Sequence, residues 1–241
     1  MKKIVAFAGF ALLSVGAFAQ TNLQVFYDFG ENRKYTTTTL EMFKSDNWGS
    51  TFFFVDYNYT TSDQRKYQDM YGATSTYMEI ERALNFWQDS KFAPLSAHVE
   101  FQAGLLGGTL GSTRNWLLGA DYFMHNADFS NTFTVSLLLK LYSKENDCKL
   151  PLQLSGVWGM NNLFGVEGLK FSGFFDLWGN YVDWGEDDSF FSFLSEPQLW
   201  YNVGQFFDCP NLHVGTEIEL SANFVQSGFV CNPCLGLKWE F

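Results

Sequence analysis

Apolar and polar side chains alternate one by one along the chain from about residue 20 onward. Between Thr216 and Phe224, for example, every second residue is apolar: Ile218, Leu220, Ala222 and Phe224. Successive side chains of a β-strand point to opposite faces, whereas those of a helix repeat about every 3.6 residues. The alternation therefore predicts strands with one apolar and one polar face, and very little helix.

About twelve segments carry this alternation, and each is roughly ten residues long, the length that crosses a bilayer as a tilted strand. Turn-forming residues separate the segments, as at Lys44–Asn47 and Cys209–Asn211. The pattern predicts an all-β fold, a transmembrane antiparallel up-and-down β-barrel of about twelve strands. The predicted strands are residues 22–30, 35–44, 48–59, 75–86, 95–105, 114–124, 132–143, 151–160, 167–183, 194–203, 212–225 and 231–241.

The N-terminal residues carry an export signal. Lys2 and Lys3 precede an almost wholly apolar run from Ile4 to Phe18, and Ala17–Ala19 is a small-x-small cleavage signature. These features predict a secretory signal peptide over residues 1–19. The remaining residues, 20–241, are then predicted to form a single exported barrel.

The C-terminal segment decides between a soluble and a membrane barrel, because alternation alone is compatible with both. One face of this segment is unbroken and apolar, through Leu235, Leu237, Trp239 and Phe241. A last strand of this kind, ending in Phe, is similar to the signal by which outer-membrane barrels are inserted. We therefore expect an outer-membrane location, lipid around the barrel, and the barrel-assembly machinery as a partner that binds the Phe241 strand.

Composition narrows the possible functions. Aromatic residues make up 19% of the chain, yet the mean hydropathy is −0.10, because the apolar residues are spread one by one along the chain. After residue 19 no apolar run approaches the roughly 18 residues that a spanning helix needs, so membrane-spanning helices are excluded. The net charge is −11, and loss of Lys2 and Lys3 with the signal peptide makes the barrel more acidic still. So acidic a chain repels the phosphate backbone, so nucleic acid is excluded as a partner.

The alternation also assigns side chains to the lumen. The inward charged residues are predicted to be Glu41, Glu79, Glu81, Glu100, Asp121, Asp176, Glu217, Glu219, Glu240, Lys140, Lys170, Lys238 and His98. Inward aromatic rings next to carboxylates could stack a planar base and hydrogen-bond to it, although the same side chains could equally fill and stiffen a small barrel. The predicted ligand-binding residues are Phe26, Glu41, Phe52, Phe54, Asp56, Glu79, Glu81, Asp176, Trp178 and Trp200.

Cysteine and histidine residues give little sign of catalysis. Cys209 is predicted in a periplasmic turn and Cys148, Cys231 and Cys234 near the outer rim, so at most one disulfide is expected, with Cys209 free. His125 and His213 are predicted at periplasmic turns, and His98 in the lumen. No Ser–His arrangement, zinc-site spacing or phosphate loop is present, so we expect no enzyme activity, no metal and no cofactor.

Several stretches resemble the Tsx-type nucleoside-specific channels of outer membranes. They are Leu40–Phe43 leading into Trp48 and Phe52–Phe54, then Met78–Glu81, then Tyr181–Gly185, and their order matches that family over most of the chain. The resemblance implies a twelve-stranded barrel that passes nucleosides through a narrow lumen. We expect the barrel to be a monomer. The chain departs from the family in being shorter and in carrying four cysteines.

The predicted function is a channel for small solutes, with nucleosides as the expected solute. Two alternatives remain open from the sequence. One is a non-conducting barrel with a structural or surface-receptor role, and the other is an outer-membrane lipid enzyme.

Overall fold

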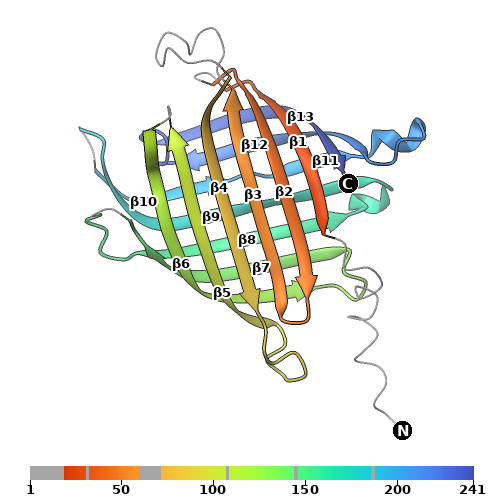
Figure 1. The fold of residues 1–241 in the computed structure, drawn as a ribbon, viewed down its shortest axis with the longest axis horizontal. Coiled ribbons are helices and arrows are strands. Elements are labelled where there is room, and N and C mark those ends of the chain that lie inside the picture. Colours follow the sequence, from red (N-terminus) through yellow and green to blue (C-terminus); the bar gives the residue numbers. More distant parts are fainter. Residues whose placement is uncertain (1–18, 31–32, 60–71, 107–108, 144–145, 186–187) are drawn as a thin grey trace.

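The computed structural model describes residues 19–30, 33–59, 72–106, 109–143, 146–185 and 188–241 (Figure 1). All but the last residue of the predicted signal peptide therefore lies outside the described residues. The same holds for most of the long loop predicted at 60–74 and for Glu186 and Asp187 in the acidic loop.

The described residues are almost entirely β-structure, in agreement with the alternation. The elements are β1 (Gln20–Asp28), β2 (Thr36–Asp46), β3 (Gly49–Tyr59), β4 (Ala73–Leu84), β5 (Leu95–Leu106), β6 (Thr109–His125), β7 (Asn131–Leu141), β8 (Leu152–Asn161), η1 (Leu163–Gly165), β9 (Leu169–Asp183), β10 (Asp188–Ser195), β11 (Gln198–Tyr201), η2 (Val203–Phe206), β12 (Leu212–Ala222) and β13 (Phe229–Glu240). Among the described residues, no helix is long and apolar enough to cross a membrane.

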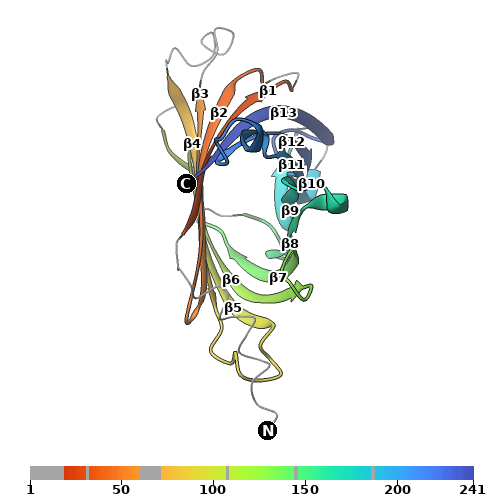
Figure 2. The same cartoon turned by 90° about the vertical axis from the view of Figure 1, so that its right-hand side faces the viewer.

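Each strand pairs antiparallel with its neighbours, and the first strand pairs with the last, which closes the barrel. The β1–β13 register joins Asn22 to Glu240 and Asp28 to Cys234, so β1 begins and β13 ends at the same rim. In the side view, β2–β4 form one wall, and β9–β12 lie across the lumen from it (Figure 2).

One position in the wall is shared by two short strands. Both β10 and β11 pair with β9 on one side and with β12 on the other. Together they count as one strand, so the wall has the predicted twelve strands. The predicted segment 194–203 was wrong in two respects: the first piece, β10, already begins at Asp188, and Pro197, which has no N–H to donate to a ladder, separates it from β11. Two backbone hydrogen bonds connect the break to the neighbouring strands. Glu196 N–H donates to the Phe174 carbonyl of β9, and Ile218 N–H of β12 donates to the Pro197 carbonyl.

The two faces of the wall have the polarity of a membrane barrel. In β13 the lumen-facing Asn232, Cys234 and Lys238 are buried, whereas the outward Leu235 and Leu237 are 58% and 53% exposed. The same arrangement holds in β1, where the outward side chains are apolar and exposed and Gln24 and Asp28 are buried. Apolar residues thus cover the outside and polar residues fill the inside, the reverse of a soluble protein.

All four cysteines are free thiols. Cys231 is exposed on the outer face of β13 and Cys234 is buried on the lumen face. Because their side chains point to opposite faces of one strand, this pair cannot form a disulfide. The expectation of at most one disulfide, with Cys209 free, agrees with this arrangement.

Candidate functional site: the barrel lumen

Strand register places the predicted ligand-binding residues on the lumen face. Asn22 pairs with Glu41, Glu41 with Phe54, and Phe54 with Glu79, so one row of inward side chains runs around the wall from β1 to β4. Side chains two residues away along each strand share that face. The predicted residues on the lumen face are Phe26, Glu41, Phe52, Phe54, Asp56, Glu79, Glu81, Asp176, Trp178 and Trp200.

A chain of hydrogen bonds runs along the lumen face of β4, β5 and β6. The Tyr77 hydroxyl donates to Glu79 (2.5 Å), and the Gln102 amide donates to both Glu79 (3.0 Å) and Glu100 (2.6 Å). The chain continues through His98, which lies between Glu100 and Asp121; its partners are Glu100 Oε2 (3.3 Å) and Asp121 Oδ1 (2.9 Å).

Both described side-chain partners of His98 are thus carboxylates. Among the described residues, no serine hydroxyl is a hydrogen-bond partner of His98, the one histidine predicted for the lumen.

A second chain of polar contacts faces the first from β7, β8 and β9. Lys140 Nζ donates to Gln153 (3.1 Å), Gln153 donates to Ser155 (3.0 Å), and Ser155 donates to Asp176 (2.5 Å). The Lys140 ammonium also lies 4.7 Å from the centre of the Trp178 ring. Trp178 is buried by these contacts, so its ring is held by the wall and offers little surface to a solute.

An ion-pair cluster lies near the rim between β1 and β2. Arg33 bridges Asp28 of β1 (3.2 Å) and Glu219 of β12 (2.5 Å), and it lies 5.8 Å from the centre of the Tyr35 ring. Burial raises the pKa of Tyr35 to about 12, so this phenol stays neutral at ordinary pH. The cluster therefore links the segment after β1 to the C-terminal half of β12.

Two of the predicted binding aromatics are packed against each other. The Phe26 and Trp200 rings lie 5.5 Å apart, and their exposed fractions are 4% and 0%. Trp200 also donates to Gln198 (2.8 Å) and receives Lys238 Nζ at 4.2 Å from its ring centre. Rings without an exposed face cannot stack a solute, so these two have the structural role that the sequence left open.

The accessible aromatic rings lie on β3 and β4. Phe52 and Phe54 are 6.1 Å apart, Phe54 is 5.9 Å from Tyr77, and all three are only half-buried. Glu41 and Asp56 flank this aromatic row on the lumen face. Asn22 donates to Glu41 (2.9 Å) and Thr39 donates to Asp56 (2.6 Å), which fixes both carboxylates in place.

Sequence reasoning missed three parts of this lumen. Tyr77 shares its face with Glu79 and Glu81, so the alternation that found those acids could have identified it. The amides Asn22 and Gln102 were missed because neutral polar residues carry no distinctive pattern. His213 was wrongly predicted at a turn: it is the second residue of β12 and is buried on the lumen face, with Nε2 3.4 Å from Glu240.

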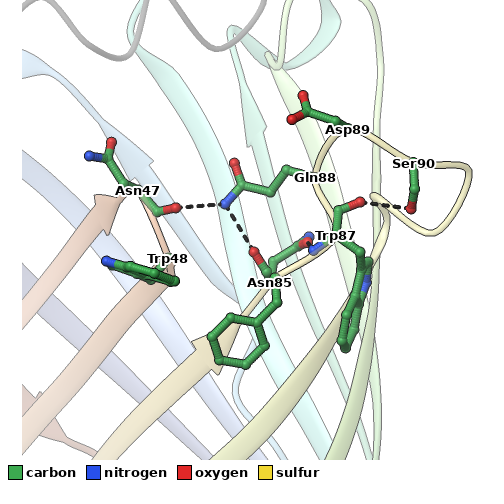
Figure 3. Close-up of a pocket in the computed structure, with 8 residues that line it drawn as sticks. Asn47, Trp48, Asn85, Trp87, Gln88, Asp89 and Ser90 are labelled. Carbon is green, nitrogen blue, oxygen red and sulfur yellow. Dashed lines mark hydrogen bonds between the residues drawn. The ribbon is translucent and has the colours of Figure 1, made fainter.

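A separate pocket of about 350 Å³ lies outside the lumen, at the turns that follow β2 and β4 (Figure 3). Gln88 spans it, donating to the carbonyls of Asn47 (2.9 Å) and Asn85 (3.1 Å). Trp48 and Phe86 line it and are about 60% exposed. Exposed aromatics at a barrel rim are typical of residues at the membrane interface, and none of the predicted ligand-binding residues lies in this pocket.

Comparison with solved structures finds other membrane barrels. The NanC porin shares 10% identity, with a TM-score of 0.55 over 92% of this chain and 100% of that one. The KdgM porin shares 10%, with a TM-score of 0.51 over 92% and 99%. The outer-membrane phospholipase dimer of Salmonella typhi, solved with bound calcium, shares 13%, with a TM-score of 0.56 over 96% of each chain. At these identities the likeness shows the shared fold.

Sequence comparisons add a family without a known activity. No curated protein matches the chain. The resemblance to Tsx-type channels therefore stays a prediction from the motifs. A family described as a domain of unknown function, DUF5020, matches residues 19–241. Since that match covers nearly the whole length, the chain belongs to the DUF5020 family.

Proposed function

We propose that the protein is a monomeric outer-membrane channel for small solutes, and that nucleosides are among the solutes it passes. The observation that carries the proposal is the half-buried aromatic row of Phe52, Phe54 and Tyr77 beside the fixed carboxylates of Glu41 and Asp56. The shared fold with porins supports the channel part of the proposal, and the motif resemblance to Tsx-type channels supports nucleosides as the solute.

Each part of a nucleoside has a counterpart in this row. A base has an apolar π-face, and stacking on an aromatic side chain contributes about 1–3 kcal/mol per base in nucleic-acid complexes. Ribose hydroxyls and base amino groups are donors, and carboxylates are acceptors. Weak binding at several such places allows a solute both to enter and to leave, as conduction requires.

The acidic side chains of the lumen also determine which solute charge the channel should admit. Carboxylates from β3, β4, β9 and β12 face the lumen, and they outnumber the basic groups that accompany them. A low-dielectric wall carrying one sign of charge repels solutes of that sign. We therefore expect a neutral nucleoside to enter and its 5′-monophosphate to be excluded.

Planar-bilayer conductance of the refolded barrel tests this proposal. We expect small single channels whose current falls when adenosine or thymidine is added, and does not change with glucose or adenosine monophosphate. Phe52→Ala and Phe54→Ala should each weaken the nucleoside block by about 5–150-fold, the equivalent of one lost stacking contact. Phe53→Ala is the matched control, because Phe53 lies between them on the outer face.

Each result separates the competing functions. A barrel that inserts but never conducts would overturn the channel and favour a structural or receptor role. Conductance that nucleosides do not block would support the channel function and overturn the proposal that nucleosides are among its solutes. Loss of block in Phe53→Ala as large as in Phe54→Ala would show that the aromatic row is not the binding site.

A further inference from the structure

Three side chains with metal-binding atoms meet on the lumen face of β4 and β5. Glu81 of β4 pairs directly with Glu100 of β5, and His98 lies two residues before Glu100 on the same face. One ligand atom from each residue lies within 4.8 Å of those of the other two. The group is reached from the lumen through Glu81, which is half-buried, whereas His98 and Glu100 are 6% and 4% exposed.

A fourth residue orients the histidine. Asp121 of β6 contacts His98 Nδ1 with both carboxylate oxygens, at 2.9 and 3.0 Å. An ionised carboxylate only accepts, so Nδ1 carries the proton and donates it. The other ring nitrogen, Nε2, then faces Glu100, at 3.3 Å from Oε2, and Glu81 belongs to the same group of ligand atoms. A carboxylate behind a histidine whose free nitrogen faces further ligands is the arrangement that supports metal-binding histidines in proteins.

The surroundings of His98 call for a positive charge. A neutral imidazole with Nδ1 protonated directs a lone pair from Nε2 toward Glu100 Oε2, only 3.3 Å away, which is repulsive unless a cation lies between them. None of the hydrogen bonds described in this part of the lumen reaches the Glu81 carboxylate. Gln102, which donates to Glu100, also donates to Glu79, so a further carboxyl group lies next to this cluster.

We propose that Glu81, His98 and Glu100 bind one divalent transition-metal ion, of the Mn²⁺ or Zn²⁺ type, on the lumen wall, with Asp121 as a positioning residue. The 3.3 Å separation of His98 Nε2 and Glu100 Oε2 fits two ligands that each lie about 2.0–2.2 Å from one ion. A nitrogen ligand beside two carboxylates favours these metals over Ca²⁺ and Mg²⁺, which prefer oxygen alone.

The competing arrangement has a proton in place of the metal, so that His98 is an imidazolium paired with Glu100 and Asp121. Direct metal binding distinguishes the two. The purified barrel, refolded in detergent and freed of metal with a chelator, is titrated calorimetrically with MnCl₂ and with ZnCl₂. Both metals are used because the free cysteines can bind Zn²⁺, whereas Mn²⁺ prefers oxygen and nitrogen ligands.

We expect one Mn²⁺ per wild-type barrel. His98→Gln and Glu81→Gln should each lower the affinity more than 10-fold, and Asp121→Asn should lower it by about 10–100-fold, as losses of an orienting carboxylate do. Glu81→Gln is the key variant, since it leaves the hydrogen-bonded chain through Gln102 intact and should fold normally. The control is His213→Gln, which removes another lumen histidine that also lies near a carboxylate, Glu240.

Two results would overturn the site. One is a wild-type barrel that binds neither metal. This result would favour the competing arrangement, in which His98 is an imidazolium paired with Glu100 and Asp121. The other is binding that Glu81→Gln and His98→Gln leave unchanged, or that His213→Gln weakens equally. The titration needs no conduction, so it succeeds or fails independently of the proposed channel.

Discussion

At the scale of single residues, strand parity decides which way a side chain points but does not decide what covers it. The strict two-residue repeat correctly placed Phe26, Phe54 and Trp200 on the lumen face. It could not separate Trp200, with no exposed surface, from the half-buried Phe54, because burial depends on the neighbouring strands: the Trp200 ring lies over Gly215 and Gly236 and against Phe26. Candidate binding residues could therefore be predicted as a set, and their accessibility could not.

Trp200 should be a major source of stability. Its ring packs on Phe26, its indole N–H donates to Gln198, and Lys238 lies over its face. Trp200→Ala removes all three contacts and opens space in the lumen, so we expect a loss of about 3–5 kcal/mol of unfolding free energy and a larger conductance. Trp200→Phe, which keeps an apolar ring, should recover most of the stability. Denaturant unfolding in detergent measures both, and an unchanged midpoint for Trp200→Ala would contradict this role.

At the scale of strands, eleven of the twelve predicted segments correspond to single strands of the structure. The exception is the wall position occupied by β10 and β11, where the sequence predicted one continuous strand at 194–203. Pro197 is visible in the sequence, and a proline within a strand pattern is a signal for such a break, so the break itself could have been predicted. Local alternation does not show that β9 and β12 pair with both pieces and hold them in one position of the wall.

Gly173 of β9 accommodates this break. Its φ is +149°, and a Cβ there would lie 2.5 Å from the Glu196 carbonyl oxygen and 2.9 Å from the Pro197 Cα. Backbone cannot move aside as a flexible side chain can, so Gly173→Ala should lower the unfolding free energy by about 1–3 kcal/mol and slow refolding.

Gly185→Ala is the matched control for Gly173→Ala. Gly185 also has a positive φ, +93°, but a Cβ there would meet no atom within 4 Å. It should therefore show only the backbone cost, about 1 kcal/mol. Equal losses of unfolding free energy in the two variants would mean that the contact with the strand break contributes nothing.

At the scale of the whole barrel, closure and charge act together. Because β1 pairs with β13, the lumen is a ring of inward side chains enclosed by an apolar wall. Asp56 of β3 and Glu217 of β12 both face the lumen, and three strands of the wall lie between them. Carboxylates enclosed by a low-dielectric wall raise the local concentration of cations.

The barrel should therefore select cations over anions. In a bilayer with a tenfold KCl gradient, the reversal potential should have the sign of K⁺ preference and should move toward zero in the double variant Asp56→Asn with Glu217→Gln. The preference should weaken at molar salt, where the screening length shrinks from about 10 Å at 0.1 M to about 3 Å. Asp128→Asn, at an exposed turn, is the control and should change nothing. Anion preference in the wild-type barrel would contradict the lumen charge that the register assigns, and with it the expected exclusion of nucleoside monophosphates.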